Sequence, residues 1–207
     1  SPETPQELLD WVKERVAIPE REWALLHDAM RRDHDGIPEH VVESIATKLA
    51  RVSPRGADAP LIVALERLPA LVASLYGAGD PPPTELLDGA APPAMPLDED
   101  FDPEEMLTAF VGEWMQFYGP REDSFLASTL GLEPGRLELA LGDLIDGEKV
   151  ITGDLVTDRE GRYVCDAENF ESLLRISRAA AVPSFEPVPL ETLPLMLATV
   201  QRLPERR

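Results

Sequence analysis

The sequence is poor in cysteine, in cations and in long apolar runs, and each scarcity excludes a class of protein. The single cysteine, Cys165, cannot form a disulfide within the chain, which excludes a small domain held together by disulfides. No apolar run approaches the length of about eighteen residues that a membrane span needs, and the amino terminus does not resemble a secretory signal. These absences predict a cytoplasmic protein that has no contact with a membrane.

The sequence motifs of the common catalytic sites are also missing. There is no G-x-x-x-x-G-K-[ST] loop for a nucleoside triphosphate, no G-x-S-x-G elbow and no H-E-x-x-H zinc motif. The spacing of His27, His34 and His40 matches no set of metal ligands, and Cys165 is expected to pack on a strand. The sequence therefore predicts no catalytic residue, no metal site and no cofactor in this chain.

Cations are outnumbered throughout, with 19 lysines and arginines against 39 aspartates and glutamates and a net charge of −20. The excess is uneven, because residues 1–80 carry 9 cations against 14 acids and residues 81–207 carry 10 against 25. Lysine and arginine supply most of the affinity of proteins for phosphate backbones. The chain alone is therefore predicted to bind DNA or RNA weakly.

The sequence does contain a regular series of helix and strand signals and a hydrophobic content of 43%, which predicts a packed core. We interpret residues 1–77 as a small mixed α+β domain. Within it we expect helices that start at Pro5 and Glu20, a helix over Pro38–Leu49, strands over Ala50–Val52 and Pro60–Leu65, and a helix over Pro69–Leu75.

Residues 78–100 are interpreted as a linker because proline, glycine and acidic residues alternate there without periodicity. Pro81-Pro82-Pro83 and Pro92-Pro93 exclude a regular helix. A single packed turn over Thr84–Leu87 is the alternative left open. At the other end, residues 181–207 are predicted to begin a following domain or to form a C-terminal helical extension, with an apolar helix over Leu190–Leu203.

Residues 101–180 carry the pattern of a winged helix-turn-helix domain. The expected elements are a helix capped by Asp102, a short helix from Asp123 to Gly131, a second helix from Pro134 to Gly147, and a hairpin in which Val150, Ile151, Leu155 and Val156 face Tyr163 and Val164, followed by a helix capped by Asp166. The predicted fold class is thus α+β and mostly helical: a winged helix-turn-helix domain joined by a Pro-rich linker to a small mixed α+β domain.

The helix from Pro134 holds the position of a DNA-reading helix, but its polar positions are mostly acidic. Arg136, Glu138, Asp143 and Asp146 lie between its core positions, and carboxylates there repel phosphate. Packing is therefore the favoured role of this helix. The candidate nucleic-acid contacts elsewhere are five arginines: Arg121, Arg159, Arg162, Arg175 and Arg178.

Several spaced motifs of residues 101–203 resemble one helicase family. They are Phe117-Tyr118-Gly119-Pro120, Ala127-x-x-Leu130-Gly131-Leu132, Leu141-x-x-Leu144-Ile145-x-Gly147-x-x-Val150-x-x-Gly153, Tyr163-Val164-Cys165-Asp166, Phe170-Glu171-Ser172-Leu173-Leu174-Arg175-Ile176-Ser177-Arg178, Pro183-Ser184-Phe185-Glu186-Pro187 and Leu193-Pro194-Leu195-Met196-Leu197-Ala198. This series is similar to the winged-helix region of the large helicase-related (Lhr) family and its passage into the next domain.

The resemblance implies a place after the motor of a superfamily-two ATP-dependent helicase. In that family two RecA-like motor domains, which use ATP and Mg²⁺, precede the winged helix. This chain would then be a non-catalytic accessory region that braces the motor domains in cis and helps to form the channel for single-stranded DNA or RNA in the intact protein. The alternatives are a free-standing acidic winged-helix adaptor that binds other proteins, and a DNA-binding transcription regulator, which the acidic charge disfavours.

Overall fold

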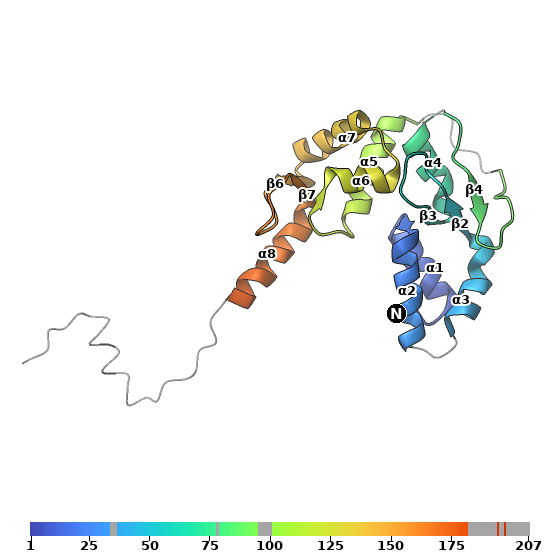
Figure 1. Cartoon of the computed structure of the whole chain (residues 1–207), viewed down its shortest axis with the longest axis horizontal. Helices are drawn as coiled ribbons and strands as arrows, with labels where there is room; N and C mark the ends of the chain where they lie inside the picture. The colour runs from blue at the N-terminus through green and yellow to red at the C-terminus, as the bar shows by residue number, and fades with distance from the viewer. Residues whose placement is uncertain (34–36, 78, 95–100, 182–193, 195–196, 198–207) are drawn as a thin grey trace, which may run out of the picture. The chain divides into compact units, whose positions relative to one another are not determined.

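The computed structural model describes residues 1–33, 37–77, 79–94 and 101–181, together with Pro194 and Leu197 (Figure 1). The protein is α+β and mostly helical, with two small antiparallel sheets, and it divides into two compact units, Ser1–Glu171 and Ser172–Arg207. The helix predicted over Leu190–Leu203 lies outside the described residues, apart from Pro194 and Leu197.

The chain begins with three helices: α1 (Pro5–Glu14), α2 (Glu20–Asp33) and α3 (Ile37–Ile45). The predicted start of α1 is confirmed, because Thr4 Oγ1 accepts a hydrogen bond from the Glu7 backbone N–H at 3.2 Å. The third helix is shorter than predicted. It ends at Ile45, and a 3₁₀ turn over Ala46–Lys48 leads into the first sheet.

The first sheet contains β1 (Ile18–Pro19), β2 (Leu49–Val52), β3 (Leu61–Ala64) and β4 (Thr84–Leu86) in the order β1-β3-β2-β4. The two central strands and the following helix α4 (Leu68–Tyr76) confirm the predictions. The turn considered over Thr84–Leu87 is instead a strand, in which Leu86 lies opposite Ala50. It pairs there because the outer edge of β2 needs backbone partners, a requirement that no local pattern encodes.

Apart from β5, the elements after residue 100 follow the predicted order. They are α5 (Pro103–Met115), β5 (Arg121–Glu122), α6 (Asp123–Leu130), α7 (Pro134–Asp146), β6 (Val150–Gly153), β7 (Tyr163–Asp166) and α8 (Ala167–Ala181). Both predicted caps are confirmed: Asp102 accepts from the Glu104 N–H at 2.9 Å, and Asp166 accepts from the Asn169 N–H at 2.9 Å.

The second sheet has the order β5-β7-β6, with Ile151 opposite Cys165 and Arg121 opposite Val164. The hairpin itself is confirmed, but the prediction that Leu155 and Val156 pair with β7 is wrong. Strand β6 ends at Gly153, which lies opposite Tyr163, so both residues belong to the connecting loop. The strand β5 was not predicted, because two residues are too few to show an alternating pattern.

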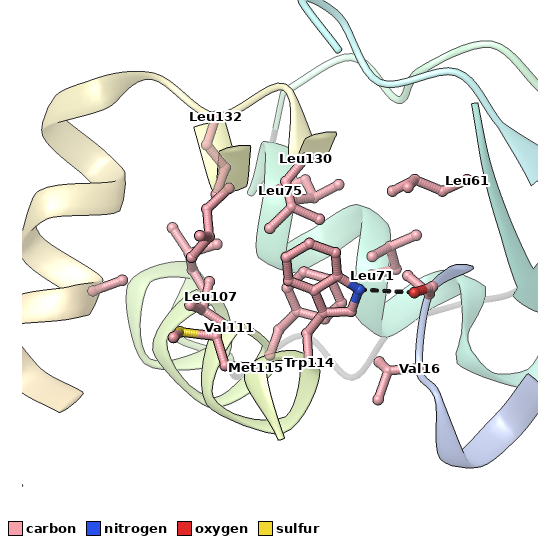
Figure 2. Close-up of a cluster of buried hydrophobic side chains, with 14 of the residues drawn as sticks. Val16, Leu61, Leu71, Leu75, Leu107, Val111, Trp114, Met115, Leu130 and Leu132 are labelled. Carbon is pink, nitrogen blue, oxygen red and sulfur yellow. Dashed lines mark hydrogen bonds between the residues drawn. The ribbon is translucent and has the colours of Figure 1, made fainter. Parts of the chain in front are cut away.

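The larger hydrophobic core contains residues from both sides of the segment 78–100. Val16, Ala17 and Leu71 lie in the same cluster as Leu107 and Trp114 (Figure 2). The Trp114 indole N–H donates to the Ala17 carbonyl oxygen at 2.8 Å, shown as a dashed line in Figure 2. The predicted linker therefore connects two halves that share one core. The limits of the four predicted domains remain a prediction.

A smaller core lies between helices α1–α3 and the first sheet, and His27 is partly buried at its border. The His27 ring packs against Trp23 with ring centroids 4.7 Å apart, and its buried Nε2 has no hydrogen-bond partner in the described part of the chain. Burial, followed by the nearby Arg31, lowers the pKa of His27.

Acidification is expected to destabilise the protein through His27. Because its pKa is lower in the folded state, the unfolded state binds the proton more readily, so stability is intact above about pH 6.5 and falls as the pH decreases below it. Urea midpoints measured at about pH 7 and about pH 5 test this. His27→Gln should reduce the difference between the midpoints, whereas His40→Gln, at an exposed position, should not; equal effects would contradict the assignment.

Candidate functional site

Helices α6 and α7 meet at a tight turn whose geometry the sequence encodes locally. Gly131 ends α6 in the left-handed conformation with a φ of 66°, and its N–H donates to the Ala127 carbonyl oxygen. Leu132 is buried, and Pro134 begins α7 after Glu133. The apolar sides of the two helices join the larger core through Leu130 and Leu137. The opposite sides of the pair are therefore available for interaction.

Arg136, the single cation in the sequence of α7, is held against α4 and α5. Its guanidinium donates to the Leu75 carbonyl oxygen at 2.6 Å and to the Ser74 carbonyl oxygen at 3.1 Å, and it forms an ion pair with Glu104 at 3.0 Å. The two carbonyls belong to the last turn of α4, which carries the negative end of the helix dipole. The first turn of α7 is thus fastened to the preceding half of the unit.

Replacing Arg136 by alanine is expected to lower the free energy of unfolding by about 1–2 kcal/mol, because the Ser74 and Leu75 carbonyls lose their donor. The matched variant Glu104→Gln keeps these two hydrogen bonds and alters only a largely exposed ion pair, so its expected loss is about 0.5 kcal/mol or less. Urea denaturation measures both. Equal losses would mean that the carbonyl contacts do not contribute.

The outward side of α7 is acidic and open. Glu138, Asp143 and Asp146 are exposed, and no ion pair joins them to a cation in the described residues. Leu139 is 67% exposed on the same side. A Cβ added at Gly135 or at Gly142 would meet no neighbouring group within 4 Å, so this side of the helix is open. The prediction that the polar positions of this helix are acidic therefore extends to its accessible surface, where Arg136 is only partly exposed because its guanidinium is held against α4 and α5.

A groove of about 310 Å³ lies between α6 and α7. Its lining combines apolar and charged side chains: Asp123, Ser124, Ala127, Pro134, Leu137, Glu138, Leu141 and Arg162. Arg162 donates to Thr152 Oγ1 at 3.1 Å and lies 3.8 Å from an Asp123 carboxylate oxygen. The sequence had assigned Asp123 only to the start of a helix, and no local signal indicates that it borders a groove.

Two of the five candidate arginines lie in or directly beside the second sheet. Arg121 is exposed on β5, with its guanidinium 4.8 Å from the centroid of the Phe125 ring, and Arg162 precedes the neighbouring strand β7. Arg159 is exposed in the loop between β6 and β7. Arg175 and Arg178 are exposed on the part of α8 that belongs to the second unit, where Arg175 donates to Ser172 Oγ at 3.1 Å.

Sequence reasoning missed Arg15, which the fold surrounds with aromatic rings. Its guanidinium lies 5.2 Å from the Trp11 ring centroid and 5.1 Å from that of Phe117, and it forms a 2.7 Å ion pair with Glu22. Burial and the Glu22 carboxylate raise the pKa of the neighbouring Tyr118. The four-residue spacing of Trp11 and Arg15, at the end of α1 and its cap, was visible in the sequence, but the approach of Phe117 was not.

The described residues show no cluster of metal-ligating side chains. They contain no group of three or more histidine, cysteine, aspartate or glutamate side chains that could hold a metal ion, and His34 lies outside them. Cys165 is buried on β7, and burial raises the pKa of its thiol to about 11.

In the described part of the chain, no helix has the length and apolar character that crossing a membrane requires. Comparisons of the chain with protein-family models, with curated proteins and with solved structures found no match.

Proposed function

We propose that this chain is a non-catalytic winged-helix scaffold, an accessory region of an Lhr-like ATP-dependent helicase. The order of the elements supports a winged helix-turn-helix: α5, β5, α6 and α7 precede a hairpin, and β5 completes a small sheet with it. In this proposal the chain works in the cytoplasm, braces the motor domains in cis and helps to form the channel for single-stranded DNA or RNA. ATP and Mg²⁺ belong to the motor domains.

The observation that carries the scaffold role is the position of Arg136. In a DNA-reading helix-turn-helix, the amino-terminal residues of the second helix contact base edges in the major groove. Here the cation in that part of α7 is bound to carbonyl oxygens of α4. Exposed Glu138 and Asp143 follow it, and carboxylates repel the phosphates that flank the groove. This arrangement favours a packing role for α7 over the recognition of base pairs. It therefore disfavours the hypothesis that the chain is a DNA-binding transcription regulator.

The second candidate is a free-standing adaptor that binds other proteins. The observation that favours it is the shared core, because Ser1–Glu171 form one compact unit around Trp114. Such a unit could present α7 to a partner without the support of a motor domain. The two candidates differ in whether the chain affects the binding of a nucleic acid by helicase motor domains.

Fluorescence anisotropy of labelled single-stranded DNA, single-stranded RNA and a tailed duplex at low salt tests the proposal. The chain alone is expected to bind more weakly than about 10⁻⁴ M, the weak limit of ordinary non-specific binding, and to tighten binding by the motor domains of an Lhr helicase added to it. Tight, steeply salt-dependent binding by the chain alone would overturn the scaffold role. If the chain neither binds nucleic acid alone nor changes its binding by the motor domains, the result would favour the adaptor.

Variants identify which arginines act in the tightened complex. Replacing Arg121, Arg159 and Arg162 together by alanine should weaken that complex if the second sheet contacts the strand. A second variant replacing Arg175 and Arg178 tests α8 separately. Arg21→Ala, an exposed position on α2, is the control for a general loss of positive charge.

A further inference from the structure

The groove between α6 and α7 has an apolar floor and an acidic rim. Leu137 and Leu141 of α7 and Ala127 of α6 line its floor, whereas Asp123 and Glu138 stand on opposite helices at its border. Its volume of about 310 Å³ accommodates one or two large side chains rather than a helix. The shape therefore suits a protruding apolar side chain with polar neighbours.

The charged side chains at the border of the groove determine which residues are favoured next to the docked apolar side chain. The Asp123 side chain is 39% exposed, and its Oδ2 lies 3.8 Å from Arg162, a distance at the limit of an ion pair. The exposed part of the carboxylate can therefore still meet an incoming cation. Glu138 is exposed and takes part in no ion pair within the described chain. Arg162, the one cation among the described residues that line the groove, is engaged with Thr152 and Asp123. A cationic donor is the complementary group.

The same charges argue against two other occupants. A nucleic acid would bring phosphates toward Glu138 and toward Asp143 and Asp146 on the same helix, which are also exposed. A second copy of this chain would bring another net charge of −20. A cationic protein segment is attracted by the same negative charges, which raises both its affinity and its association rate.

We propose that this groove docks a segment of a partner protein in which an apolar side chain is flanked by lysine or arginine. The apolar side chain enters between α6 and α7, and the flanking cations meet Asp123 and Glu138. The inference goes beyond the scaffold role, because it names the chemistry of the bound segment and does not require that the partner be a helicase motor. Its test measures peptide binding without any helicase motor domain, so its failure is distinguishable from that of the proposed function.

The test uses the full chain and a fluorescein-labelled peptide of sequence Lys-Leu-Lys-Lys-Leu-Leu-Lys-Lys-Leu-Lys, titrated by anisotropy at about 0.1 M salt. Glu138→Lys should weaken binding about tenfold, because an attraction becomes a repulsion. Ser124→Trp, which fills the groove from an exposed position, should weaken it by a similar factor. A peptide with serine in place of leucine should bind more weakly than the parent.

Asp146→Lys is the matched control. It makes the same kind of charge change on the same helix, but it lies outside the groove, about 12 Å along the helix from Glu138 and beyond a Debye length at this salt concentration. It should change the affinity less than about twofold. Circular dichroism verifies that each variant is folded.

Three outcomes would overturn the proposal. The first is the absence of peptide binding by the unmodified chain. The second is an equal loss in Glu138→Lys and Asp146→Lys, which would indicate attraction to net charge alone. The third is binding of labelled single-stranded DNA that Ser124→Trp abolishes, which would assign the groove to nucleic acid.

Discussion

Replacing Trp114 by alanine is expected to lower the free energy of unfolding by about 3–5 kcal/mol, the usual cost of removing a large aromatic side chain from a core. Trp114 is 1% exposed and lies in the cluster that contains residues from both halves of Ser1–Glu171. Its ring is also 4.4 Å from that of Tyr118, centroid to centroid. The alanine variant would leave a cavity and an unpaired carbonyl at Ala17.

This variant also tests whether the two halves unfold together. Trp11 and Trp23 remain as fluorescent probes in the first half, whereas circular dichroism reports on all helices. If the core is shared, the urea midpoints from both probes fall together. A fluorescence transition that stays unchanged while circular dichroism shifts would contradict the shared core and support independent domains on either side of residues 78–100.

Two controls separate the contributions of Trp114. Trp114→Phe keeps much of the buried area but removes the indole N–H, so the Ala17 carbonyl loses its donor and the expected loss is about 1–3 kcal/mol. Leu25→Ala removes a large apolar side chain that is 67% exposed on α2, and its expected effect is within about 0.5 kcal/mol. The expected order of the losses in the free energy of unfolding is Trp114→Ala, then Trp114→Phe, then Leu25→Ala.

Replacing Gly131 by alanine is expected to cost about 3 kcal/mol, the sum of two effects. The left-handed φ of 66° disfavours any residue with a Cβ by about 1–2 kcal/mol. The added Cβ would also lie too close to the Arg55 carbonyl oxygen and 3.1 Å from the Ala57 nitrogen, so backbone must move. Nearby, the Asp58 N–H donates to the Ser128 carbonyl oxygen at 2.8 Å, which makes this contact part of a wider junction.

Gly56→Ala is the matched control for Gly131→Ala. Gly56 has a φ of 78°, but no atom lies within 4 Å of the position of its Cβ, so only the backbone conformation opposes the substitution. Its expected cost is about 1 kcal/mol. Chemical denaturation compares the two variants. Equal costs would show that the backbone around Arg55 moves away from the added Cβ without a measurable cost. Gly131 would then be required only for the positive φ of the turn.

Much of the fold was predictable from signals that act over a few residues. Asp102 and Asp166 cap helices because their carboxylates reach N–H groups two or three residues ahead, and Gly131 ends α6 because it accepts a positive φ. The acidic character of α7 at Glu138 and Asp146 could be read directly, since no fold changes the charge of a side chain at neutral pH when it stays exposed.

The candidate site was only partly predictable, because it depends on which distant segments meet. Arg136 was expected among the outward polar positions, but it binds the carbonyl oxygens of Ser74 and Leu75, more than sixty residues away in the sequence. Asp123 was recognised as a helix start, but its place on the rim of a groove requires α7 beside it. The sequence shows which side chains are present, but it does not show which distant residues they contact.

The sequence by itself therefore determined the helices, their caps, the central strands and the excess of negative charge, because each depends on local backbone preferences or on composition. Only the tertiary structure decided that Thr84–Leu86 forms a strand, that Trp114 reaches Ala17 and that Arg136 turns toward α4. In each of these cases a polar backbone or side-chain group found its partner far away in the sequence, and no local pattern specifies such a pairing.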